Sequence, residues 1–132
     1  MKTELFYLTW VTVLTGLLWV PYVLDRAAVW GLTDTVGYPD NPKPLSPWAR
    51  RLMKAHVNAV ENLVVFATLV LAAQAAGVSN GLTADASVAY FWARVVHPIA
   101  YTFALPWVRT LAFVVGFVAQ AIFAKELLGA LM

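Results

Sequence analysis

Four long apolar stretches follow one another along the chain, and short polar connections separate them. The first is the clearest, because Leu5–Leu24 holds twenty residues without a charge. A helix needs about 20 apolar residues to cross a bilayer, so each stretch is long enough for one span. The pattern predicts an all-α fold, an integral membrane four-helix bundle that forms one domain over residues 1–132. The expected helices cover about residues 4–28, 47–76, 84–105 and 108–131.

Prolines and glycines mark where these helices end or bend. Gly31–Pro47 contains four prolines and three charged residues and has no apolar period, so we expect an irregular aqueous connection there. Ser46 and the proline after it form a good helix start, because a hydroxyl can cap the helix and a proline ring fits the first turn. Gly77–Gly81 predicts a turn. Kinks are expected where a proline removes a backbone donor inside a helix, at Pro21 and Pro98.

Two of the predicted helices carry polar residues on one face. On the second helix the spacing is i, i+4 and i+7, and on the third it is i, i+3 and i+7, so each set shares a helical face. These residues are Lys54, Asn58 and Glu61, and then Arg94, His97 and Tyr101. An ionisable side chain at the bilayer centre costs roughly 2.5–3.5 kcal/mol even on the lenient insertion scale. The two faces must therefore meet protein or a wet cavity, and together they predict a site.

The composition supports a membrane protein and excludes several classes of function. The chain is 61% hydrophobic and 12% charged, whereas soluble domains average about 25% charged residues. Such a chain cannot cover a globular surface with polar groups. The net charge is only +2, and the charges are not clustered with interleaved aromatic residues, so we expect no nucleic-acid partner. The chain has no cysteine, so any thiol chemistry must come from a ligand.

Basic residues are distributed unevenly between the two predicted membrane sides. Five of the nine Lys and Arg residues lie around the first connection, and Arg109 marks the third connection. Only Lys2 and Lys125 mark the other side. By the positive-inside rule, the termini lie outside and the polar faces open toward the cytoplasmic half.

Simpler explanations exist for some of these residues. Arg50, Arg51 and Lys54 could be ordinary anchors at a cytoplasmic helix end. Glu61 and Arg94 could form an ion pair that only holds two helices together.

The two histidines do not predict a metal centre. His56 lies about 200° around the helix from Lys54, so we expect it to make a structural hydrogen bond. Only Glu61 could join His56 and His97, and the chain has no zinc spacing, catalytic serine triad or phosphate-binding glycine loop. We therefore expect no bound metal.

A ligand pocket accounts for more of the polar residues than an ion pair does. A cationic rim would hold ligand carboxylates, while Asn58 and Glu61 would bind an amine or amides. Tyr101 and Arg109 would then lie near a reacting group. An arginine beside a thiol favours the thiolate, which is the nucleophilic form.

Three sequence motifs together resemble the MAPEG family, the membrane-associated proteins of eicosanoid and glutathione metabolism. The first runs Lys54-Ala-His-Val-Asn58-Ala-Val-Glu61-Asn62. The second and third are Ala93-Arg94-Val-Val-His97-Pro98-Ile-Ala-Tyr101 and Pro106-Trp-Val-Arg109-Thr110. The resemblance covers three of the four predicted helices and the overall length, and it points to a bacterial-type member similar to microsomal glutathione transferases. It implies a homotrimer in the bacterial inner membrane, with glutathione bound between neighbouring subunits.

The resemblance also implies roles for individual residues. Arg109 resembles the arginine that stabilises the glutathione thiolate, and Tyr101 would assist it with a hydrogen bond. The residues that resemble glutathione contacts, or basic residues near them, are Arg26, Arg51, Lys54, Asn58, Glu61, Arg94, His97 and Thr110. Glutathione would act as a co-substrate, and a lipophilic small molecule would reach the site from the lipid bilayer.

The chain departs from the family pattern at two positions. Lys54 stands where well-studied members have an arginine, and a lysine lacks the two-pronged fork of a guanidinium. Arg51 lies one turn earlier on the same face and could replace it. Asn62 stands where one branch of the family has a tyrosine.

The sequence predicts a membrane glutathione transferase or peroxidase that acts on lipophilic electrophiles or lipid hydroperoxides. The family also includes a lipid-binding scaffold without catalysis, so a scaffold is the alternative. A small transporter subunit is disfavoured, because the chain shows neither inverted repeats nor a pair of broken helices.

Overall fold

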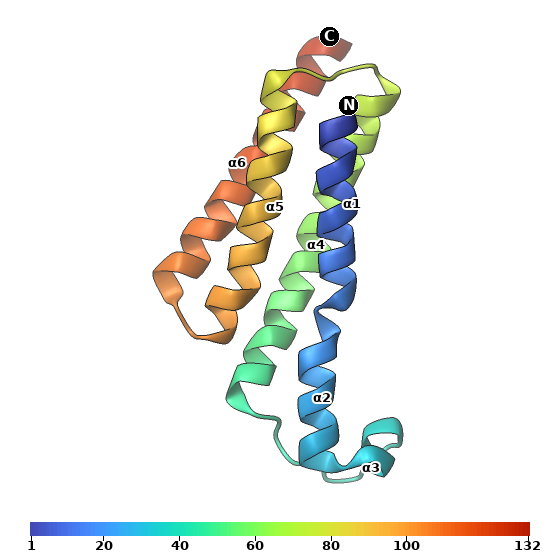
Figure 1. Ribbon diagram of the computed structural model, residues 1–132, viewed down its shortest axis with the longest axis vertical. Helices are drawn as coiled ribbons and strands as arrows, with labels where there is room; N and C mark the ends of the chain where they lie inside the picture. The colour runs from blue at the N-terminus through green and yellow to red at the C-terminus, as the bar shows by residue number, and fades with distance from the viewer.

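The computed structural model describes residues 1–132, and its regular structure is entirely helical, which confirms the all-α prediction. The first two helices follow each other along one rod, the long later helices run beside it, and a short helix lies in the connection between them (Figure 1). The elements are α1 (Lys2–Leu17), α2 (Trp19–Trp30), α3 (Leu32–Val36), α4 (Pro47–Ala75), α5 (Gly81–Thr102) and α6 (Pro106–Leu131).

The first rod is interrupted at Leu18, so the continuous helix predicted over about residues 4–28 is divided in two, three residues before the kink expected at Pro21. The amide of Leu18 bonds weakly to the carbonyl of Thr15, at 3.4 Å and only three residues back. Pro21 has no amide hydrogen for the carbonyl of Leu17, and its ring crowds that carbonyl. The break therefore lies near the middle of the rod, one turn before the proline.

Three helical rods are long and apolar enough to cross a membrane, which fits an integral membrane protein. They are α1 together with α2 (Lys2–Trp30), α4 (Pro47–Ala75) and α6 (Pro106–Leu131). The fourth long helix, α5, is not among them. It packs most extensively against α6 and also contacts α1 and α4. Neighbouring helices therefore cover much of α5, and its buried residues include polar side chains.

The connection between α2 and α4 is more ordered than predicted. It contains the short helix α3, and the indole nitrogen of Trp30 donates to the carbonyl of Lys43 at 2.7 Å. The helix α4 begins at Pro47 as expected, but the hydroxyl of Ser46 does not cap it. Both the hydroxyl and the amide of Ser46 donate instead to the carboxylate of Asp25, at 2.6 and 3.0 Å. This pair of bonds ties α2 to the start of α4.

The turn between α4 and α5 lies where the glycines predicted it, although α5 begins three residues earlier than expected. Gly77 has a φ of 72°, in the left-handed region that favours glycine. Asn80 and Thr83 then form a reciprocal capping box at the start of α5. At the other end, α5 continues as an α-helix through Pro98 to Thr102.

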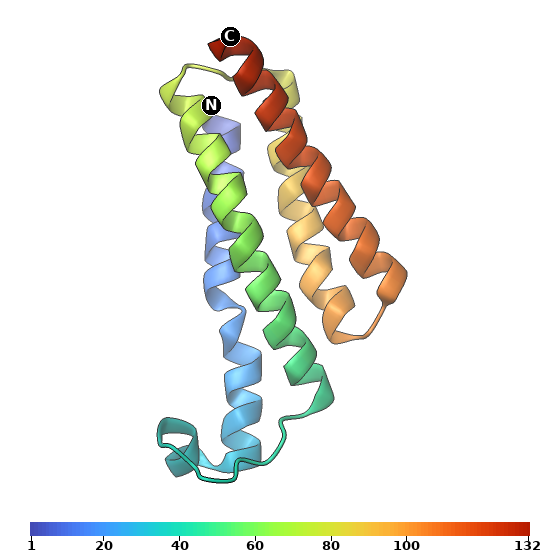
Figure 2. The same cartoon turned by 180° about the vertical axis from the view of Figure 1, so that it is seen from behind.

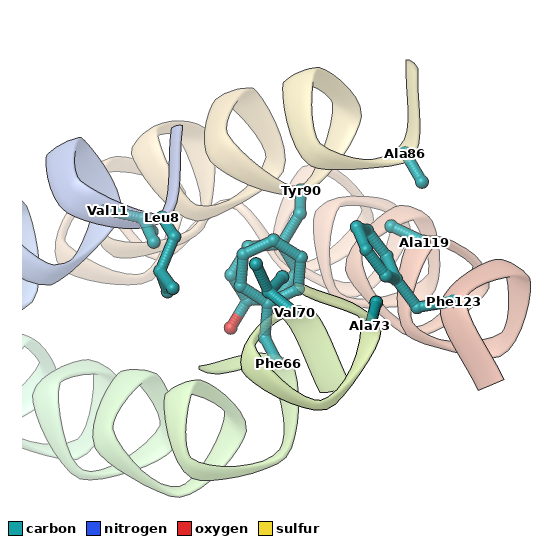
Figure 3. Packing of buried hydrophobic residues seen from close by; sticks show 9 residues of the cluster. All are labelled: Leu8, Val11, Phe66, Val70, Ala73, Ala86, Tyr90, Ala119 and Phe123. Atoms are coloured by element: carbon teal, nitrogen blue, oxygen red, sulfur yellow. The ribbon is translucent and has the colours of Figure 1, made fainter. Parts of the chain in front are cut away.

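The apolar core lies between α1, α4, α5 and α6, nearer to the chain termini than to the α5–α6 turn. Phe66 stacks on Tyr90 with ring centroids 3.8 Å apart, and Phe123 meets Phe66 edge-on at 5.7 Å (Figure 3). Both termini lie at the same end of the molecule, and the α5–α6 turn lies toward the other end (Figures 1 and 2).

A hydrogen-bonded cluster at the terminal end joins three segments. The buried carboxylate of Glu4 accepts from the hydroxyls of Ser79 and Thr83, at 2.6 and 2.8 Å. The N-terminal ammonium group also lies 3.6 Å from this carboxylate. Asn80 reaches α6 through a 3.0 Å bond to Glu126. We call Glu4, Ser79, Asn80, Thr83 and Glu126 the terminal cluster.

Candidate functional site

The turn between α5 and α6 brings two predicted site residues together. The amide of Leu105 bonds back to the carbonyl of Ala100 at 2.8 Å, and Ala104 adopts a positive φ of 57°. This tight reversal starts α6 close to the last turn of α5. As a result, the guanidinium carbon of Arg109 lies 4.8 Å from the ring centroid of Tyr101. A cation stacked on an aromatic face is stabilised and held in orientation.

Arg109 and Tyr101 line two neighbouring pockets. The larger, of ≈ 310 Å³, is formed by α4, α5 and α6, and its lining residues are Asn58, His97, Tyr101, Arg109, Thr110 and Phe113. The smaller, of ≈ 180 Å³, lies against the turn and adds Arg51 to the same Tyr101 and Arg109. Six of the ten predicted site residues therefore line one continuous region, which we call the Arg109 pocket.

Arg51 is fixed at the edge of the Arg109 pocket by a backbone contact. Its Nε donates to the carbonyl of Thr102 at 2.9 Å, at the end of α5, where carbonyls lack helical partners. One nitrogen of the guanidinium is used in this way, and the planar fork keeps further donors for a ligand. This bond links the basic start of α4 to the α5–α6 turn.

Asn58 belongs to a chain of amide contacts that crosses from α4 to α6. The side-chain nitrogen of Asn62 donates to the backbone carbonyl of Asn58 at 2.8 Å and lies 3.3 Å from its side-chain oxygen. The side-chain nitrogen of Gln120 in turn donates to the backbone carbonyl of Asn62 at 3.1 Å. We call these three residues the amide chain.

Arg94 and His97 are buried inside the single chain, at 3% and 2% exposure. Nε and Nη2 of Arg94 and Nδ1 of His97 have no hydrogen-bond partner within the protein. The aliphatic part of Arg94 passes Gly116, where an added Cβ would lie 3.9 Å from its Cδ. His97 meets Tyr101 edge-on, with ring centroids 5.7 Å apart. The two unused donors of Arg94 and the free ring nitrogen of His97 favour a bound polar group beside the pocket.

Three predicted site residues lie away from the Arg109 pocket. Glu61 and Lys54 are exposed on the outer face of α4, and Glu61 is at the midpoint of that helix. Arg26 stands on α2, with its guanidinium carbon 5.2 Å from the ring centroid of Trp30.

Of two side-chain contacts considered from the sequence, the structure contains the hydrogen bond of His56 but not the ion pair between Glu61 and Arg94. The ion pair between Glu61 and Arg94 is not formed within the chain, whose single salt bridge joins the N-terminus to Glu4. The structural hydrogen bond expected for His56 is confirmed, because its Nδ1 lies 2.7 Å from the hydroxyl of Tyr22.

Sequence reasoning missed two residues of the site region. Phe113 lines the larger pocket but stands in an uninterrupted apolar run, so no sequence signal distinguishes it. Gln120 did carry a signal, since it is the single amide in the uncharged part of α6. A buried amide in a membrane helix needs a partner, and here the partner is the backbone of Asn62.

The Arg109 pocket suits an anionic ligand. Its lining contains two arginines, a tyrosine, a threonine, an asparagine and a histidine, and it contains no carboxylate. Guanidinium groups hold carboxylates through paired hydrogen bonds, and the fixed charge of Arg109 favours any group that develops negative charge beside it.

The comparisons with known proteins identify the family of the chain. No curated protein and no solved structure matches the chain. The model of the MAPEG family matches residues 7–129, which include every predicted site residue and all of the Arg109 pocket. The chain belongs to the MAPEG family.

Proposed function

We propose that the protein is a glutathione-dependent membrane enzyme, a transferase or peroxidase for lipophilic electrophiles or lipid hydroperoxides. The observation that carries this proposal is the stacking of Arg109 on Tyr101 in the wall of the Arg109 pocket. A permanently charged guanidinium beside the pocket can favour a thiolate without giving up a proton. The thiolate is the reactive form of glutathione, and the chain itself supplies no thiol.

The remaining pocket residues suit the binding of a peptide with two carboxylates. Arg51 offers donors to a carboxylate, while Asn58, His97 and Thr110 offer neutral hydrogen bonds. We propose that the hydroxyl of Tyr101, which lines the same pocket, donates to the sulfur and so supports Arg109. Arg94 lies next to His97 with two donors unused, and we propose that it completes the hydrogen bonding of the bound ligand.

We further propose a homotrimer of four-helix bundles in which neighbouring subunits complete the site. Glu61 and Lys54 are exposed on α4, and Glu61 lies at the middle of a predicted span. A charge facing lipid at that depth costs roughly 2.5–3.5 kcal/mol or more, so contact with a second copy would relieve it. In such an assembly, Glu61 and Lys54 of one subunit would face the ligand held by its neighbour, and Arg26 would lie at the rim.

A lipophilic second substrate is supported by the outer face of α5 and α6. Two apolar pockets of ≈ 290 and ≈ 390 Å³ lie there and meet at Ala89 and Val115. Their linings are hydrophobic except for Asp85. Surfaces of this kind accept acyl chains, which is consistent with a substrate that arrives from the bilayer.

The orientation that we propose places the termini outside a bacterial inner membrane and the Arg109 pocket toward the cytoplasm. Both termini lie at one end of the molecule, and the basic residues around the first connection lie toward the other (Figure 1). The positive-inside rule assigns the basic end to the cytoplasm, where glutathione would be available.

The test is glutathione binding and thiolate formation in purified protein, compared between wild type and Arg109→Ala. We expect Arg109→Ala to keep glutathione affinity within a few-fold, because other residues hold the peptide. It should abolish the ultraviolet absorbance of the bound thiolate and conjugation with a model electrophile. Arg50→Ala is the matched control, since Arg50 is exposed at the same end and lines neither part of the pocket.

A lipid-binding scaffold is the second candidate, and the apolar pockets on α5 and α6 favour it. If wild type binds lipid but neither binds glutathione nor forms a thiolate, the scaffold replaces the enzyme. If Arg109→Ala forms thiolate and turns over at the wild-type rate, Arg109 is an anchor and the proposed mechanism is wrong.

A further inference from the structure

We propose that Asn62 is a positioning residue that orients the side-chain amide of Asn58, so that Asn58 presents its NH₂ group to the ligand. This inference rests on the proposed function, because it concerns how the Arg109 pocket holds glutathione. It specifies what Asn58 recognises, namely a hydrogen-bond acceptor on the ligand.

The backbone fixes which atom of Asn62 is the donor. Its terminal atom lies 2.8 Å from the carbonyl oxygen of Asn58, and a carbonyl oxygen can only accept. The atom must therefore be Nδ2 and not Oδ1. The same nitrogen lies 3.3 Å from one end of the Asn58 side chain, which must then be an acceptor, Oδ1. The orientation of both amides follows from one backbone group.

The other end of the Asn58 side chain is left without a partner inside the protein. Asn58 makes no side-chain hydrogen bond except the one from Asn62, and it lines the larger part of the Arg109 pocket. It is only partly buried, so its Nδ2 can meet a ligand. Nδ2 carries two hydrogens and cannot accept. The free Nδ2 end of Asn58 therefore suits a carboxylate or amide carbonyl of the ligand and does not suit an ammonium group. The sequence analysis allowed either an amine or an amide of the ligand as the partner of Asn58, and we now propose a hydrogen-bond acceptor.

Gln120 supports Asn62 from the neighbouring helix. It is 7% exposed, and its Nε2 donates to the backbone carbonyl of Asn62 at 3.1 Å. This bond holds the α4 backbone at Asn62 against α6, and α6 also carries Arg109 and Thr110. The amide chain thus sets the position of Asn58 relative to the charged side of the pocket.

The test is a double-mutant cycle on glutathione affinity, measured by calorimetry with the full-length protein in detergent. Asn62→Leu removes the donor, keeps a side chain that branches at Cγ, and lets the Asn58 amide rotate by about 180°. We expect it to weaken binding about 2- to 12-fold, the range that one net hydrogen bond gives. In an Asn58→Ala background, Asn62→Leu should change affinity by less than about twofold, because its effect passes through Asn58.

A second variant reverses the polarity of the contact. Asn62→Asp is nearly isosteric with the wild type, and its carboxylate accepts from Nδ2 of Asn58. It should turn the donor away from the pocket and weaken glutathione binding more than Asn62→Leu does, by about tenfold or more. If Asn62→Leu fails to fold, the same cycle is run with Asn62→Asp.

The outcomes separate this inference from the proposed function. Equal effects of Asn62→Leu in the wild-type and Asn58→Ala backgrounds would assign Asn62 a general structural role and overturn the inference alone. Wild-type affinity in both Asn62 variants would also overturn it, with glutathione binding still established. If the wild-type protein binds no glutathione, the proposed function fails and this inference fails with it.

Discussion

Replacing Glu4 by alanine should destabilise the protein markedly, although Glu4 lies at the end of the molecule far from the Arg109 pocket. Its carboxylate is 1% exposed and accepts two hydroxyl bonds, from Ser79 and Thr83. A hydrogen bond to a charged group contributes about 1.5–3 kcal/mol. Thr83 keeps other partners in Asn80, so the variant does not leave its hydroxyl stranded. We therefore expect the free energy of unfolding to fall by about 3 kcal/mol, which is the lower end of the range for two such bonds.

The measurement is unfolding in mixed micelles of increasing SDS content, followed by tryptophan fluorescence. Glu4→Gln keeps one acceptor oxygen without the charge, and should lower the free energy of unfolding by about 1–2 kcal/mol. Lys2→Ala is the control, because Lys2 is exposed on the same turn and should stay within about 0.5 kcal/mol of wild type. If Glu4→Ala and Lys2→Ala unfold at the same SDS content, the stabilising role assigned to the Glu4 carboxylate is wrong.

Three further predictions concern the assembly, the packing of α5 on α6 and the orientation. Glu61→Gln should remove glutathione binding while the trimer stays intact, as measured by size-exclusion chromatography in detergent. If the trimer is lost but the separated subunits bind glutathione normally, Glu61 has only a structural role in the assembly. Gly116→Ala should be tolerated in thermal unfolding, because its Cβ would lie 3.7 Å from the Tyr90 ring, an ordinary contact. Gly116→Leu should cost about 1–3 kcal/mol by overpacking, and equal stability of the two variants would contradict this packing. A reporter fused after Met132 should be active only outside the cytoplasm, and cytoplasmic activity would reverse the proposed orientation.

The sequence predicts the helices well because their signals are local. A run of apolar residues with proline or glycine at its end defines a helix without reference to other parts of the chain. The start of α4 at Pro47 is an example. The side-chain cap predicted at Ser46 is wrong, because the hydroxyl of Ser46 donates to Asp25 on α2 instead. Asp25 is distant in the sequence, so local spacing does not reveal this partner. The sequence predicts a kink at Pro21, whereas the helix is interrupted at Leu18, because the effect of the proline falls on the preceding turn.

The Arg109 pocket was predictable in part for a similar reason. Helical spacing places His97 and Tyr101 on one face, and the short α5–α6 turn brings Arg109 back beside them. Periodicity does not determine how a helix is rotated against its neighbours. The face of α4 that carries Glu61 therefore points outward in the single chain, while Asn58 reaches the pocket. Contacts such as Gln120 to Asn62 depend on that rotation, and no spacing rule supplies it.

The terminal cluster and the Arg109 pocket lie at opposite ends of the same helices. At the terminal end, the carboxylate of Glu4 on α1 accepts hydrogen bonds from Ser79 in the α4–α5 turn and from Thr83 in the first turn of α5. At the pocket end, the bond from Arg51 to Thr102 is the side-chain link between α4 and the last residue of α5. A helix as long as α6 spans about 39 Å, so a change of about 5° in its tilt would move its far end by about 3 Å. That distance is comparable to one hydrogen-bond length, so the tilt of the long helices must be fixed to within a few degrees if the walls of the Arg109 pocket are to keep their spacing.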